Sequence, residues 1–113
     1  MMRRVEKLER AVWCKSMCES IVCYGFKEGK KPEEYVDGED RYLKDYIADL
    51  GKETVVAIMK DVVDNVVRID EDVYTDSEGC TYNHIVYKDG YKEARYLKDA
   101  MYQIWDETVG DKN

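Results

Sequence analysis

The sequence lacks the features that mark membrane and secreted proteins. No apolar run approaches the roughly 20 residues of a membrane-spanning helix. The first residues, MMRRVEKLERAVWC, are charged and contain no apolar core of a signal peptide. We therefore expect a cytoplasmic protein, whose four cysteines are reduced thiols or metal ligands rather than disulfides.

Residues with catalytic potential are also scarce. His84 is the only histidine, and no serine lies in a nucleophile motif. The glycines at positions 25, 29 and 38 are too scattered for a phosphate-binding loop. We expect a protein that is not an enzyme.

The composition is that of a folded protein with a strongly charged surface. Hydrophobic residues make up 44% of the chain and charged residues 38%, which predicts one globular domain over residues 1–113. The net charge is -7, but residues 1–31 carry eight Lys/Arg against four Glu. The acidic excess therefore lies in the remainder of the chain.

Apolar residues recur at helical spacing in four segments, and the predicted helices span residues 3–22, 41–50, 52–67 and 91–109. Gly51 separates the second helix from the third and can take a positive φ. Between the first two helices, residues 25–40 predict a loop, with one helical turn begun by Pro32.

After the third helix the apolar period changes to two, which predicts a β-hairpin at about residues 68–88. Its turn is Asp76-Ser77-Glu78-Gly79, and with Thr75 facing Cys80 the alternating residues of both strands would share one face of the hairpin. The predicted fold class is α+β, with about four helices packed against a two-stranded antiparallel hairpin.

The cysteines and the histidine suggest a metal site. Cys14, Cys18 and Cys23 have the spacing C-x3-C-x4-C, and Cys80 and His84 share one face of a predicted strand. If the hairpin docks on the first helix, four of these five ligands could form a closed, structural Zn²⁺ site. The alternative is that the cysteines are core thiols, because cysteine is among the most buried residue types.

The most acidic stretch spans residues 61–79, where Arg68 is the only cation. Such a surface repels nucleic acid and attracts basic protein. The sequence also has ten tyrosines, a residue type that suits protein-binding surfaces. The predicted partner-binding residues are acidic apart from one tyrosine: Asp61, Asp64, Asp70, Glu71, Asp72, Tyr74, Asp76 and Glu78.

With its acidic run over residues 61–79 and its small, tyrosine-rich plan, the chain resembles the phage and mobile-element inhibitors called anti-CRISPR proteins. The resemblance is one of type and rests on no shared motif. It implies a protein that acts in the bacterial host cytoplasm, where it inhibits an RNA-guided CRISPR nuclease of type II. Inhibition would block the binding or loading of target DNA, without direct binding of the inhibitor to nucleic acid.

Two other functions fit parts of the sequence. Residues 46–61 have the outline of a helix-turn-helix, and with the basic first helix they suggest a small transcriptional regulator. The second helix of that motif, however, carries several acids where a DNA reader needs cations. The other alternative is a structural or adaptor protein of a phage.

Overall fold

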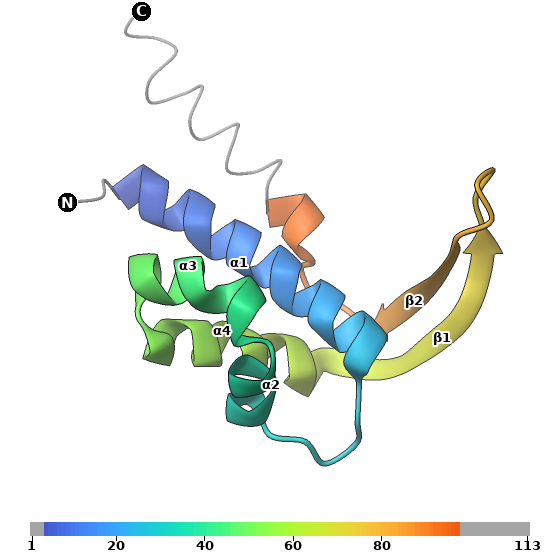
Figure 1. Ribbon diagram of the computed structural model, residues 1–113, viewed down its shortest axis with the longest axis horizontal. Helices are drawn as coiled ribbons and strands as arrows, with labels where there is room; N and C mark the ends of the chain where they lie inside the picture. The colour runs from blue at the N-terminus through green and yellow to red at the C-terminus, as the bar shows by residue number, and fades with distance from the viewer. Residues whose placement is uncertain (1–3, 98–113) are drawn as a thin grey trace, which may run out of the picture.

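A computed structural model describes residues 4–97, in which helices α1 to α4 (residues 4–65) precede a β-hairpin (Figure 1). The α+β class is confirmed, with an antiparallel two-stranded sheet. In chain order the elements are α1 (Arg4–Gly25), α2 (Pro32–Gly38), α3 (Asp40–Leu50), α4 (Lys52–Asn65), β1 (Val66–Thr75) and β2 (Thr81–Tyr87).

Helix α1 supplies one side of the core. Its residues Cys14, Cys18 and Val22 are fully buried. They lie four residues apart, so they share the face of the helix that packs against the core. They pack in one cluster with buried side chains of the other helices: Tyr35, Val36, Leu43, Val55, Met59 and Val62. Helix α1 ends at Gly25, three residues later than the sequence predicts.

The predicted helical turn at Pro32 is confirmed as the short helix α2, in which Tyr35 and Val36 are buried. The Tyr35 hydroxyl accepts a hydrogen bond from the Lys27 N–H (2.9 Å) and donates one to the Lys27 carbonyl (3.1 Å). The core tyrosine therefore also fixes the loop that leaves α1.

Helices α3 and α4 form the predicted pair around Gly51, which has φ 89° and ψ 147°. Only glycine adopts this conformation readily, because a Cβ atom would clash with the backbone. Helix α4 buries Val55, Met59 and Val62, which confirms that its apolar pairs form a helix despite the β-propensity of valine. It ends at Asn65, two residues before the predicted end.

Strand β1 follows α4 without a loop, and its register corrects one prediction. Thr75 lies opposite Thr81, not Cys80. The pairs Asp70↔His84 and Tyr74↔Tyr82 leave residues 71–73 of β1 opposite Asn83 alone, which is a β-bulge. The bulge interrupts the simple alternation that the sequence predicts.

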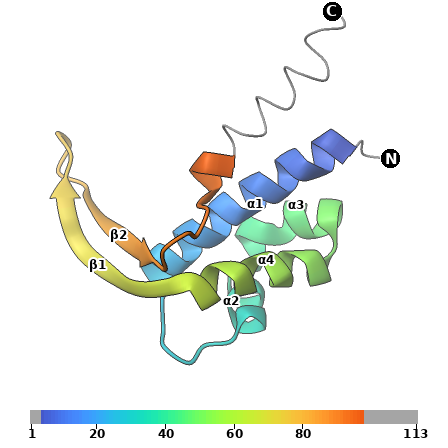
Figure 2. The same ribbon diagram turned by 180° about the vertical axis from the view of Figure 1, so that it is seen from behind.

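The hairpin curves away from the helices, and its turn is the part farthest from them in both views (Figures 1 and 2). After β2, the chain returns to α1, and residues 94–97 begin a helix there. The predicted helix 91–109 therefore starts at Ala94 rather than at Tyr91, and its part beyond residue 97 lies outside the described residues. None of the helices in the described part of the chain has the length and apolar character that a membrane span requires.

Candidate functional site

The structure divides the predicted partner-binding acids into groups with different surroundings. Three of them are ion-paired: Asp61 with Lys15 (3.1 Å), Asp64 with Lys60, and Asp70 with Arg68 (3.1 Å). The first pair joins α4 to α1, whereas the other two are local. These carboxylates are partly neutralised by cations of the same chain, so they contribute less to an attractive field.

Asp76 organises the hairpin turn. Its Oδ1 accepts hydrogen bonds from the N–H groups of Glu78 (2.9 Å) and Cys80 (3.0 Å), and its Oδ2 accepts one from the Tyr82 hydroxyl (2.8 Å). These bonds favour the ionised form, so the Tyr82 hydroxyl and the turn amides lower the pKa of Asp76. Its carboxylate has a structural role in the turn.

The remaining predicted acids, Glu71, Asp72 and Glu78, are exposed and form no ion pair within residues 4–97. We call these three the hairpin acids. Asp72 is in the bulge with φ 53°, a conformation that aspartate tolerates better than most residues. The bulge and the turn thus place uncompensated negative charge on the projecting part of the molecule.

Tyr74 lies between the bulge and the turn. Its ring stacks on that of Tyr82, with centroids 4.7 Å apart and planes 15° apart. Tyr74 remains 59% exposed, and its neighbour Val73 is 52% exposed. An exposed apolar side chain of this size, beside uncompensated charge, has the amphipathic character of a protein-binding surface.

The base of this surface is attached to the end of α1 through Asn83. Its Nδ2 donates to the Cys23 carbonyl (3.3 Å), and the Cys23 thiol donates to the Asn83 carbonyl (3.6 Å). The Asn83 Oδ1 accepts a hydrogen bond from the Asp72 N–H (3.2 Å). One amide side chain therefore connects the bulge to the helical core.

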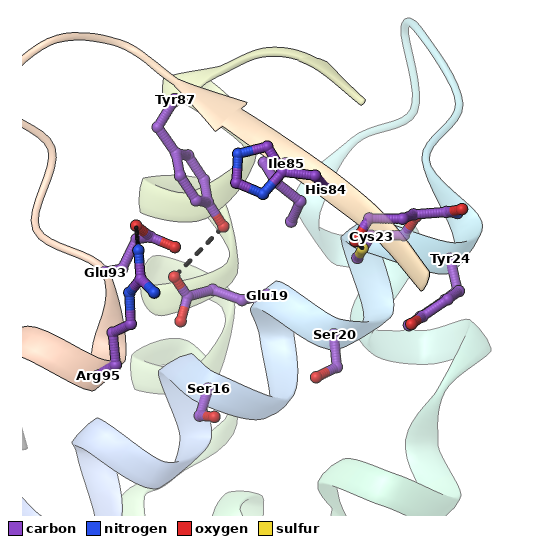
Figure 3. A pocket seen from close by; sticks show the side chains of 11 residues that line it. Ser16, Glu19, Ser20, Cys23, Tyr24, His84, Ile85, Tyr87, Glu93 and Arg95 are labelled. Carbon is purple, nitrogen blue, oxygen red and sulfur yellow. Dashed lines mark hydrogen bonds and ion pairs between the residues drawn. The ribbon is translucent and has the colours of Figure 1, made fainter. Parts of the chain in front are cut away.

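A pocket of about 300 Å³ lies between α1, β2 and residues 93–95 (Figure 3). At its wall the Glu19 carboxylate accepts hydrogen bonds from the Tyr87 hydroxyl (3.3 Å) and the Ala94 N–H (3.1 Å). Burial raises the pKa of Glu19. Glu19 therefore ties three segments together, a role that the sequence did not predict because its position is only at the edge of the apolar face.

The five candidate zinc ligands occupy three places. Cys14 and Cys18 are in the core, Cys23 and His84 line the pocket, and Cys80 ends the hairpin turn. This turn projects away from the helices (Figure 1). Residues 4–97 contain no group of three or more His, Cys, Asp or Glu side chains placed to hold one metal ion. Zinc binding stays a prediction, and so does the alternative that the cysteines are core thiols. Cys14 and Cys18 have the burial that this alternative predicts.

The helix-turn-helix alternative also depends on side-chain placement. Helix α4 turns Val55, Met59 and Val62 into the core. Its exposed residues include more acids than cations: Lys52, Glu53, Lys60, Asp61 and Asp64. A recognition helix needs the opposite balance to approach phosphates.

Comparisons with protein-family models, with curated proteins and with solved structures give no match for this chain.

Proposed function

We propose that this chain is a binding protein whose acidic hairpin occupies a basic, nucleic-acid-binding surface of a partner protein. The observation that supports it is the placement of the hairpin acids and Tyr74 on a hairpin that projects from the helices. In its specific form, the proposal names the partner as an RNA-guided CRISPR nuclease of type II in the bacterial host cytoplasm. Target DNA would then be prevented from binding or loading.

Charge complementarity allows the chain to compete with target DNA for a basic surface. A guide-loaded nuclease holds its heteroduplex in a positively charged channel through backbone contacts, without reading base sequence. A compact protein of net charge -7 can therefore compete for the same cations. Charge complementarity would mainly accelerate association, and Tyr74 would supply the apolar contact that slows dissociation.

The surroundings of the thiol and the imidazole support a binding role over a catalytic one. Burial raises the pKa of the Cys23 thiol, which also donates a hydrogen bond to the Asn83 carbonyl. A nucleophilic cysteine instead needs a lowered pKa and a base beside it. His84 is exposed on β2, and within residues 4–97 its imidazole forms no hydrogen bond that would orient it.

The experiment is a panel of guide-loaded type II nucleases assayed for target-DNA binding and cleavage, with and without a modest excess of the chain. We expect DNA binding by at least one nuclease to be lost. No effect on any nuclease would contradict the specific proposal. Duplex DNA shifted by the chain alone would favour the regulator, and a large assembly on size-exclusion chromatography would favour the phage structural protein.

A further inference from the structure

The rings of Tyr74 and Tyr82 stack near the hairpin turn, beyond the part of β2 that Asn83 and Tyr87 attach to α1. The Tyr74 ring remains largely exposed and presents one aromatic face. Tyr82 is held in place, because its hydroxyl donates to Asp76 (2.8 Å), whose carboxylate also accepts the turn amides. Tyr74 stacks on this fixed ring and is the more exposed of the two. The pair is therefore preorganised for a flat ligand.

Other tyrosines of the chain show what such a ring attracts. The Arg41 guanidinium lies 4.5 Å from the ring centroid of Tyr42, and the Arg95 guanidinium lies 4.7 Å from that of Tyr96. Lysines lie over two further rings, those of Tyr91 (4.4 Å) and Tyr35 (4.5 Å). Within residues 4–97 no cation lies over Tyr74 or Tyr82, although the nearby hairpin acids would favour one.

We propose that the Tyr74–Tyr82 pair, with Glu71 and Asp72 of the bulge, binds an arginine side chain of a basic protein. The inference rests on the proposed function, because it takes the hairpin as the interface and adds which basic residue the hairpin selects. A guanidinium is planar and weakly hydrated, so it can stack on a tyrosine ring while its N–H groups pair with a carboxylate. A lysine ammonium has no plane to stack and retains its water more strongly.

The test compares two labelled peptides of equal charge, one of about six arginines and one of about six lysines, by fluorescence anisotropy at low salt. We expect the wild-type chain to bind the arginine peptide about three- to tenfold more tightly. Tyr74→Leu removes the aromatic face and should abolish this preference, by weakening binding of the arginine peptide much more than that of the lysine peptide. Tyr74→Phe keeps the stacked ring and should keep the preference.

The matched control is Tyr42→Leu. Tyr42 is an exposed residue of α3, and the Arg41 guanidinium already lies over its ring. This variant should leave the preference intact. Backbone amide signals of Glu78 and Cys80 report whether the turn survives in each variant, since Asp76 binds both N–H groups.

Three results would overturn the inference, and the first two leave the proposed function standing. Equal affinity for both peptides, or an arginine preference that persists in Tyr74→Leu, rejects the arginine site and leaves the nuclease panel to decide the function. Binding of neither peptide rejects the arginine site and also removes the electrostatic basis of the proposed function. Conversely, an arginine preference lost only in Tyr74→Leu would support this site even if every nuclease in the panel were unaffected.

Discussion

Cys23 and Asn83 are linked by two hydrogen bonds in opposite directions. The Asn83 amide donates to the Cys23 carbonyl at 3.3 Å, and the Cys23 thiol donates to the Asn83 carbonyl at 3.6 Å. Because the Asn83 Oδ1 also accepts the Asp72 N–H, the bulge is connected to the end of α1. The Asn83 side chain therefore links the bulge to α1, in addition to the Tyr87–Glu19 bond and the direct junction of α4 with β1.

Replacing Asn83 by alanine should destabilise the protein and loosen the bulge. The variant leaves the part-buried Cys23 carbonyl without its partner, a loss that costs about 1–3 kcal/mol, whereas the exposed Asp72 N–H can bond water instead. Urea denaturation measures the change in the free energy of unfolding. Asn65→Ala is the control, because the Asn65 amide bonds only the Asp61 carbonyl at the exposed end of α4. Equal small losses in both variants would contradict the connecting role of Asn83.

Glu19 should make stability fall as the pH rises through the range just above 4. Burial raises the pKa of Glu19 in the folded state, whereas an unfolded chain has the ordinary value of about 4.3. In the interval between these values the folded state binds more protons, so raising the pH destabilises it, and above the folded pKa the loss is complete.

The variant Glu19→Gln isolates this contribution from that of the other acids. Its free energy of unfolding minus that of the wild type should increase between about pH 4 and pH 7, measured by urea denaturation at each pH. Glu33→Gln, an exposed residue of α2, is the control for loss of one carboxylate. A Glu19→Gln difference that is constant across this range would contradict the prediction.

Asp76 should act in the opposite sense. The Tyr82 hydroxyl and the turn amides lower the pKa of Asp76, so its stabilising bonds persist at pH 4 and are lost as the pH falls through the folded pKa. NMR shifts of the Glu78 and Cys80 amides should report this loss. Asp76→Asn should disturb the same amides already at pH 7, and the control Asp72→Asn should not. Amides that do not respond to Asp76→Asn would count against the turn geometry.

The zinc prediction has a direct measurement. A closed site predicts about one equivalent of zinc in protein purified without a histidine tag, determined by elemental analysis. Because Cys80 lies in the turn while Cys14 and Cys18 lie in the core, the hairpin would have to move for these ligands to meet. The hydrogen bond with Cys14 and burial raise the pKa of Cys18, so binding would also release a proton there. Less than about a tenth of an equivalent of zinc would contradict the predicted zinc site.

Periodicity in the sequence was sufficient to predict α1, α3, α4 and the hairpin. The three-four spacing in α4 and the change to a period of two after Val67 are local signals. The bulge was not predictable in this way, because no local pattern shows that residues 71–73 will oppose Asn83 alone. The pairing of β1 with β2 therefore shifts at the bulge, which the alternation of apolar residues does not predict.

The candidate surface was predictable only as a set of acids with one tyrosine, Tyr74. Which acids are neutralised depends on tertiary contacts, as in the Lys15–Asp61 pair between α1 and α4. Glu19 was missed for the same reason, since its partners Tyr87 and Ala94 are far along the chain. A carboxylate within an otherwise amphipathic helix gives no signal of what will pack over it.

The most direct test of the hairpin as the interface is competition with target DNA for a guide-loaded nuclease that the panel identifies. The variant combines Glu71→Lys, Glu78→Lys and Asp72→Asn, because asparagine tolerates the positive φ at position 72. Its control combines Glu33→Lys, Glu34→Lys and Asp45→Asn, which make the same charge change at exposed positions of α2 and α3. We predict that the hairpin variant needs at least about fivefold more protein to displace the DNA, with a weaker salt dependence, while the control stays close to wild type. Equal potency of the two variants would contradict the hairpin as the interface.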